Sequence, residues 1–416
     1  MDFIKKSFWT TLASLAFACQ SLITNKLFSV YFGPAGVTLL AHFQNIIALY
    51  TTVITDGVNR GVQRHLSDNN ISSNYWNKYV SATIIINLLC YTVVTLGLFI
   101  SFSLTSSGFP SALFTFNNIG LILISTILHL SAIFFVNMFL SEGNAKVYSI
   151  LSIINNILGL VLVYFSSRFN LEFALIFISF VPASAIFIIA PTHLVIHRDK
   201  WKQFIFHFEI SAIKQIFSFV IIALSGVIFG RFVDFFVRSY AIFHFTETET
   251  GLWQSVVKMS DGYSSVFIMA FGSLFFVRIS ANIHDHLKLQ RTLIQGLVFI
   301  SILSFIGLTM IWLLRSWLIP IFYNNNFMPA ERFLPFQLIG DFIKFPSWLL
   351  SFLLLSRLKT KEYMIVHFLS ALFYCASIYL LIPIFKIDSM PISHCIRFVF
   401  YLFMLIWLTR RDLFLR

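Results

Sequence analysis

The chain has 416 residues, of which 58% are hydrophobic and only 11% are charged. A soluble globular domain carries roughly 25% charged residues, so this composition excludes an ordinary soluble protein. The formal net charge is +12, but the Lys and Arg residues are scattered in short segments between apolar runs, which argues against a nucleic-acid-binding protein.

Twelve apolar runs follow one another along the chain, with lengths suited to crossing about 30 Å of hydrocarbon as helices. They lack the alternation of polar and apolar residues that is typical of membrane β-strands. The sequence therefore predicts an all-α polytopic membrane protein. The predicted spans are 8–31, 35–62, 79–102, 112–140, 146–166, 171–195, 212–241, 251–278, 292–314, 332–356, 362–385 and 389–409.

The distribution of basic residues predicts the orientation. If the N-terminus is cytoplasmic, 18 Lys and Arg residues fall in cytoplasmic segments and four fall in segments on the other side. Because Lys and Arg accumulate in cytoplasmic loops, we expect both termini to be cytoplasmic.

Two features indicate that the chain consists of two halves. The basic and aromatic segment 196–211 divides six predicted spans from six, and the pairs Gly36/Gly57 and Gly251/Gly272 share a separation of 21 residues. Repeated halves of this kind commonly enclose the substrate site of a transporter. We therefore expect two six-helix bundles, 1–200 and 201–416, around a central cavity.

Charged residues inside the spans indicate where this cavity lies. A charge at the lipid midplane costs about 2.5–3.5 kcal/mol, so such residues face a protein or aqueous interior, or lie near span ends. The spans contain seven bases and four acids: Lys26, Arg60, Arg231, Arg238, Lys258, Lys344, Arg397, Asp56, Asp234, Asp261 and Asp341.

Most of these charges share a helix face with a charge of opposite sign. The members of each set are three or four residues apart: Asp56 and Arg60; Arg231, Asp234 and Arg238; Lys258 and Asp261; Asp341 and Lys344. Such sets are compatible with structural neutralisation or with a polar transport cavity. Lys26, Arg60 and Arg238 also lie near span ends, where we expect long side chains to reach the interface.

The bases inside the spans exceed the acids by three. This surplus predicts an anionic partner, and phosphate or pyrophosphate fits it. We expect Arg231 and Lys258, helped by Lys26 and Arg397, to bind the anion. The candidates for cavity polarity or ion coupling are Asp56, Arg60, Asp234, Asp261, Asp341 and Lys344.

The sequence has no nucleophile motif and no phosphate-binding glycine loop. Its four cysteines have no paired spacing that suggests a metal site or a disulfide framework. We therefore expect a protein that is not an enzyme and that needs no cofactor or metal.

Three segments resemble those of a known family. They are 26–36 (KLFSVYFGPAG), 251–261 (GLWQSVVKMSD) and 337–344 (QLIGDFIK). Their order and separation are similar to those of Wzx-type O-antigen and enterobacterial-common-antigen flippases. These form the polysaccharide transporter branch of the multidrug/oligosaccharidyl-lipid/polysaccharide exporter superfamily.

The resemblance implies a V-shaped cavity lined mainly by spans 1, 2, 7 and 8. It also implies an undecaprenyl-pyrophosphate-linked oligosaccharide as substrate, flipped to the periplasmic leaflet of the bacterial inner membrane. Transport would be coupled to H⁺ or Na⁺, and the partners would be an O-antigen polymerase and a chain-length regulator.

Three alternatives are open. A drug/cation antiporter of the same superfamily would have an acidic cavity, which the surplus of bases disfavours. An enzyme such as an O-antigen polymerase or a membrane glycosyltransferase would carry a large periplasmic loop, whereas the longest outside loop, 315–331, has only 17 residues. A structural membrane subunit would have little use for eleven charges within its spans.

Overall fold

The computed structural model describes residues 2–52, 57–66, 72–104, 116–142, 144–226, 230, 232–268, 275, 278–279, 282–283, 285–357 and 359–413. Across these residues the chain is almost entirely helical and contains no strand. The prediction of an all-α protein is therefore confirmed.

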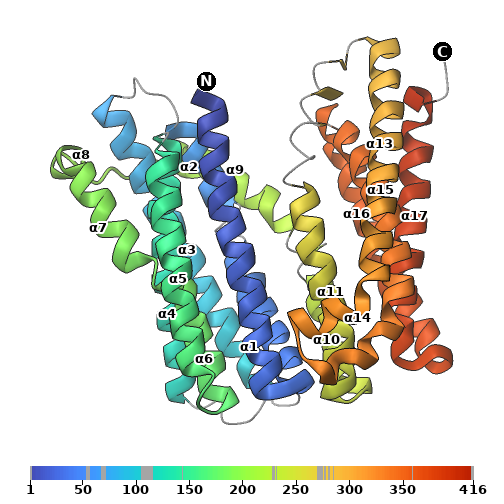
Figure 1. Cartoon of the computed structure of the whole chain (residues 1–416). Coiled ribbons are helices and arrows are strands. Elements are labelled where there is room, and N and C mark those ends of the chain that lie inside the picture. Colours follow the sequence, from blue (N-terminus) through green and yellow to red (C-terminus); the bar gives the residue numbers. More distant parts are fainter. Residues whose placement is uncertain are drawn as a thin grey trace. The chain divides into compact units, whose positions relative to one another are not determined.

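The first of two compact units contains Met1–Phe32 and Leu39–Ser239. Its helices are most of α1 (Asp2–Thr52), α2 (Asn59–Leu66), α3 (Ser73–Leu104), α4 (Phe116–Ser141), α5 (Ala145–Ser166), α6 (Leu171–Ala183), α7 (Ile186–Ile196), α8 (Arg198–Lys202), α9 (Ile210–Gly226) and the start of α10 (Val233–His244). Helix α4 packs against α6 and α7, and α3 packs against α9 (Figure 1).

The second unit contains Gly33–Thr38 and Tyr240–Arg416. Its elements after α10 are α11 (Glu247–Phe267), α13 (His286–Leu313), α14 (Arg315–Phe322), the 3₁₀ helix η5 (Asn325–Phe333), α15 (Leu334–Ser356), α16 (Thr360–Phe385), the 3₁₀ helix η6 (Lys386–Asp388) and α17 (Ser389–Leu413). Helix α15 lies between α13 and α17, and α16 packs on α17 (Figure 1).

Helix α1 includes the first predicted span and most of the second, with a break between them. Gly33 has φ 64° and ψ −162°, and Pro34 follows it inside the helix. Glycine adopts positive φ without the steric cost that a Cβ imposes. Proline in turn cannot donate the backbone hydrogen bond of a continuous helix. The sequence thus places the break where the two predicted spans meet.

Helix α11 begins at a capping box. The Thr246 side chain accepts a hydrogen bond from the backbone N–H of Glu249, and the Glu249 carboxylate accepts one from the backbone N–H of Thr246. Two N–H groups that the helix would leave unpaired are satisfied in this way. The local sequence therefore fixes the residue at which α11 starts.

Seven helical stretches of the described chain are long and apolar enough to cross a membrane. They are Ser73–Gly97, Asn117–Ser141, Lys146–Ser166, Leu171–Ile196, His286–Leu313, Asn325–Ser356 and Lys361–Leu413, the last of which contains both α16 and α17. Helix α13 exposes a run of large apolar side chains, as lipid contact requires: Ile294, Val298, Phe299, Ile302, Phe305 and Ile306. The protein is therefore a multi-pass membrane protein.

Helices α3, α4, α5, α13, α15, α16 and α17 each match a predicted span to within about six residues at either end, whereas the predicted second, seventh and eighth spans run in part over residues outside the described ranges. The sixth span consists of α6 and α7, which are separated at Ser184, and the seventh corresponds to α9 and α10. Whether the transport halves divide at residue 200 stays a prediction, as does a cavity between them.

Candidate functional site

A buried carboxylate in the second unit has donors from three helices. Asp341 on α15 is 0% exposed. Its Oδ2 accepts a 2.6 Å hydrogen bond from Ser260 Oγ and another from the Tyr263 hydroxyl, both on α11. On its other oxygen, His394 Nε2 of α17 lies 3.1 Å from Oδ1, and the Lys344 ammonium forms an ion pair with the same atom. These contacts satisfy a charge whose burial would otherwise be costly.

The ammonium of Lys344 is equally enclosed. Lys344 is 5% exposed, and its Nζ lies 3.3 Å from Ser260 Oγ. The rings of Trp348, Phe345 and Phe398 have their centroids 5.3, 5.5 and 5.9 Å from Nζ, which is within the range of cation–π attraction. Lys344 therefore pairs with Asp341, as the structural reading of this set predicts, and has no open side for a large anion.

Backbone packing brings α17 to this cluster. A Cβ on Gly340 would lie 2.5 Å from Cδ2 of His394 and 3.0 Å from the Cα of Cys395. Only a glycine permits this approach of α15 to α17. The residue next to Asp341 in the chain thus sets the distance at which His394 reaches the carboxylate.

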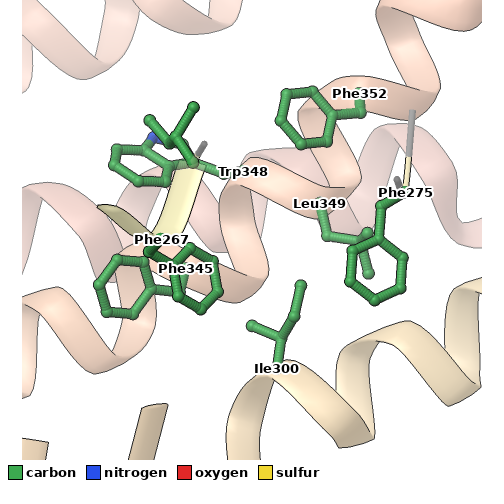
Figure 2. Close-up of a pocket in the computed structure, with 8 residues that line it drawn as sticks. Phe267, Phe275, Ile300, Phe345, Trp348, Leu349 and Phe352 are labelled. Carbon is green, nitrogen blue, oxygen red and sulfur yellow. The ribbon is translucent and has the colours of Figure 1, made fainter. Parts of the chain in front are cut away.

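A small apolar pocket, whose lining residues are drawn in Figure 2, shares two aromatic side chains with the surroundings of Lys344. It is a partly open hollow, with about 220 Å³ of empty space when its open mouth is included, and it is lined by Phe267, Ile268, Phe275, Ile300, Phe345, Trp348, Leu349 and Phe352. Phe345 and Trp348 contribute to the pocket and also lie within cation–π range of Lys344. The charged cluster is therefore bounded on this side by aromatic rings.

The helix face of α11 that carries the predicted Lys258 and Asp261 runs from a buried end to an exposed end. Gln254 is 0% exposed, and neither its Nε2 nor its Oε1 has a hydrogen-bond partner. Lys258 is half-buried, and Asp261 and Ser265 are exposed on the unit's surface. A carboxylate facing lipid at midplane depth costs about 2.5–3.5 kcal/mol, so this face is suited to water or to a polar partner.

Arg397 lies between two helices of the second unit. Its Nε donates a 3.3 Å hydrogen bond to Ser370 Oγ on α16, and its guanidinium carbon lies 5.0 Å from the ring centroid of Tyr374. The side chain is half-buried. These contacts hold the guanidinium against α16.

In the first unit, Lys26 on α1 is half-buried and Asp234 in the first turn of α10 is exposed. Arg238 differs from its prediction. It is 5% exposed, and its Nη1 donates a 2.6 Å hydrogen bond to the carbonyl oxygen of Ala41. The prediction that Arg238 extends to the interface is wrong because α1 supplies an acceptor for the guanidinium inside the unit.

Arg231 and Asp56 lie outside the described residues, as does the side chain of Arg60. Their predicted roles in anion binding and coupling therefore stay predictions. The described candidates are Lys26, Asp234, Lys258, Asp261, Asp341, Lys344 and Arg397.

Sequence reasoning missed the partners of Asp341 on other helices. Ser260 and Tyr263 flank the predicted Asp261, and His394 lies one helical turn before the predicted Arg397. The sequence signal that could have found these partners is a polar residue close to a charged residue within an apolar span. The prediction named the charged residues Asp261 and Arg397, whereas the polar residues near them in the chain are the ones that contact the buried Asp341.

No protein-family model matches the chain. The Lipid III flippases of Escherichia coli and of Shigella flexneri are each 22% identical over 384 residues, which covers 88% of this chain and 88% of each relative. The similarity therefore extends across both compact units.

Solved transporters share the fold. An inward-facing multidrug resistance MATE family transporter of the MOP superfamily has a TM-score of 0.70 at 14% identity, covering 97% of this chain and 94% of that one. A MOP superfamily transporter from Pyrococcus furiosus has a TM-score of 0.70 at 12% identity, covering 99% and 95%. The chain thus has the fold of MOP transporters and is similar in sequence to two lipid flippases, which confirms the predicted resemblance.

Proposed function

We propose that the chain flips undecaprenyl-pyrophosphate-linked O-antigen repeat units from the cytoplasmic to the periplasmic leaflet of the bacterial inner membrane. Both termini are cytoplasmic in this proposal. The halves 1–200 and 201–416 alternate in exposing the substrate site to the two sides.

The observation that carries the proposal is the polar face of α11. Lys258 and Asp261 lie on a surface of a membrane-embedded unit, in one of the three segments that resemble Wzx-type flippases. A charged surface on such a unit is useful to a protein that conducts a charged headgroup past hydrocarbon. The flippase names of the two relatives support the same class of substrate.

In this proposal Arg231 and Lys258 bind the pyrophosphate, with help from Lys26 and Arg397. Charge-assisted hydrogen bonds from Arg and Lys to phosphate oxygens are roughly twice as strong as neutral ones. Arginine adds bidentate geometry, and lysine acts as a point charge. Asp56, Arg60, Asp234 and Asp261 then tune the polarity of the cavity.

The Asp341–Lys344 pair serves as the coupling centre and does not bind the substrate. Its carboxylate is already surrounded by donors, and the Lys344 ammonium takes the position beside it that a sodium ion would need. These donors stabilise the ionised form of Asp341, so in this proposal the carboxylate takes up a proton only in a conformation in which some of them have moved away. We therefore propose that H⁺, and not Na⁺, is the coupling ion.

The pathway is tested by deleting the gene. The deletion strain should lose long surface polysaccharide, keep its lipid core and accumulate lipid-linked repeat units on the cytoplasmic face. An unchanged O-antigen ladder in a strain without a second flippase would overturn the proposal. A strain that keeps its polysaccharide but becomes sensitive to cationic drugs would indicate the antiporter instead.

The anion site is tested by charge changes in that strain. If Lys258 only balances Asp261, the double variant Lys258→Met/Asp261→Asn should recover what Lys258→Met loses. If Lys258 binds the substrate, the double variant should stay inactive at a normal protein level. A fully active Arg231→Ala/Lys258→Ala variant would exclude the anion site.

Arg231 gives a graded version of this test. Arg231→Lys should keep part of the activity because a point charge remains, whereas Arg231→Ala should lose most of it. Equal activity of the two variants would contradict a role for the charge.

A further inference from the structure

Three potential metal ligands meet at one end of the first unit. Glu142 directly follows α4, His193 lies in the last turn of α7, and His197 follows that helix. The two histidines are four residues apart, so the helix presents their rings on one face. Neither their charge nor their position is used in the proposed transport mechanism.

The distances between their donor atoms suit a shared ion. Oε2 of Glu142 lies 3.2 Å from Nε2 of His193 and 2.8 Å from Nε2 of His197. All three donor atoms lie within 4.8 Å of one another. Ligands that bind zinc at 2.0–2.2 Å in tetrahedral geometry are about 3.3 Å apart, so small movements would complete the coordination.

We propose that Glu142, His193 and His197 form a binding site for a divalent transition-metal ion of the zinc class. Two imidazole nitrogens and one carboxylate oxygen suit zinc, and water would supply a fourth ligand. Calcium and magnesium prefer sites made of oxygen ligands and would bind poorly here.

The surroundings of the site support its ligands. Lys200 Nζ donates a 3.0 Å hydrogen bond to Oε1 of Glu142, which leaves Oε2 for the ion. The Glu142 side chain is 8% exposed and that of His193 is 0% exposed. Phe139 packs edge-on against His193 with ring centroids 4.7 Å apart. The carboxylate and the His193 ring are thus held in place and shielded from water.

The hydrogen bond that Trp201 donates to His193 should weaken metal binding, and this effect on the metal affinity can be measured. Its indole Nε1, which can only donate, lies 3.2 Å from Nδ1 of His193. Nδ1 therefore accepts, and the ring proton is on Nε2, where it points toward Glu142. Metal binding at Nε2 moves this proton to Nδ1, opposite the indole N–H. Trp201 must then turn away, so it weakens metal binding.

The competing interpretation is a hydrogen-bonded cluster that joins the end of α4 to α7 and binds no metal. Both interpretations explain why these residues contact one another. They differ in what happens when zinc is added, when Trp201 is changed and when calcium replaces zinc.

The experiment uses the full-length chain, purified in detergent with a tag that contains no histidine. Zinc affinity is measured by competition with a chromophoric chelator, and Co²⁺ is added separately as a spectroscopic probe. We expect one zinc ion per chain and intense visible Co²⁺ absorption. Both signals should be lost in His193→Gln and in His197→Gln. His244→Gln, which removes an exposed histidine outside the cluster, should keep both.

Trp201→Phe separates the two interpretations without removing a ligand. It abolishes the indole donor, so the metal site should bind zinc more tightly than the wild type does. Zinc should also raise the apparent melting temperature of the wild type, as expected for a ligand that binds the folded state, whereas calcium should not. Wild-type protein that binds zinc no better than His193→Gln, or binding that is lost in Trp201→Phe, would overturn the proposal.

Discussion

Gly251 lies so close to Pro34 that a Cβ built on Gly251 would be 2.1 Å from the Pro34 carbonyl oxygen. The same Cβ would lie 2.9 Å from Oγ1 of Thr38. That hydroxyl donates a 2.7 Å hydrogen bond to the carbonyl oxygen of Glu247. The segment that follows the break in α1 is therefore attached to the first turns of α11, within the second unit.

Gly251→Ala should destabilise the second unit, because the new methyl group must displace backbone and not merely a flexible side chain. Overpacking of this kind costs about 1–3 kcal/mol. Apparent melting temperature in detergent would measure it. Gly262→Ala on the same helix is the matched control, since a Cβ there would meet nothing within 4 Å. Equal melting temperatures for the two variants would contradict this packing.

Asp341 and Lys344 should show strong energetic coupling. Removing one partner of a buried ion pair costs about 3–5 kcal/mol, because the other charge is left unpaired. The double variant Asp341→Asn/Lys344→Met should therefore be more stable than the sum of the two single changes predicts. Additive shifts in melting temperature would show that the two side chains do not interact.

The same double variant separates stability from coupling. It should insert normally and bind lipid-linked substrate, yet fail to respond to an imposed pH gradient in proteoliposomes. Transport driven by that gradient would contradict Asp341 as the coupling residue. Dependence on Na⁺ in the wild type would contradict the choice of ion.

The helices could be predicted from sequence because each span is a long apolar run with its own boundaries. The pairing of Asp341 with Lys344 could also be predicted, because a three-residue spacing within one helix fixes the relative positions of two side chains. The contacts that Tyr263 and His394 make with Asp341 could not be predicted from the sequence. They depend on the rotation and depth of α11 and α17 against α15, and Gly340 contributes to that packing.

The Glu142 cluster shows a second limit. Glu142 and His193 are 51 residues apart in the chain, and each lies at a span end, where polar residues are ordinary. Only the packing of α7 on α4 brings them together. Composition and helical spacing contain no information about that contact.

The topology predicted from basic residues can be tested with reporter fusions. A periplasm-active phosphatase should be active when fused after Asn117 or after Glu249 and inactive when fused after Lys202. We expect this pattern because Lys and Arg are enriched in cytoplasmic loops of membrane proteins, and the segment that contains Lys202 is rich in them. A phosphatase that stays inactive after Glu249 would contradict the orientation of the second half of the chain.

Glu209 should give a pH-dependent contribution to stability. It forms an ion pair with Lys78 on α3, and hydrogen bonds from Lys78 and Ser211 lower the pKa of the Glu209 carboxyl below its ordinary value of 4.5. A carboxyl with a lowered pKa stabilises the folded state above that ordinary value, and this stabilisation is lost as the pH falls through the folded-state pKa. Glu209→Gln should therefore lower the melting temperature at neutral pH, and the difference in melting temperature from the wild type should shrink as the pH falls below 4.5.

A Lys78→Met background provides the control for this prediction. There the effect of Glu209→Gln on the melting temperature at neutral pH should be much smaller, because the main cause of the lowered Glu209 pKa is gone. High salt should reduce it as well, since the pair is partly exposed. A difference that is independent of pH would mean that Glu209 acts through packing and not through its charge.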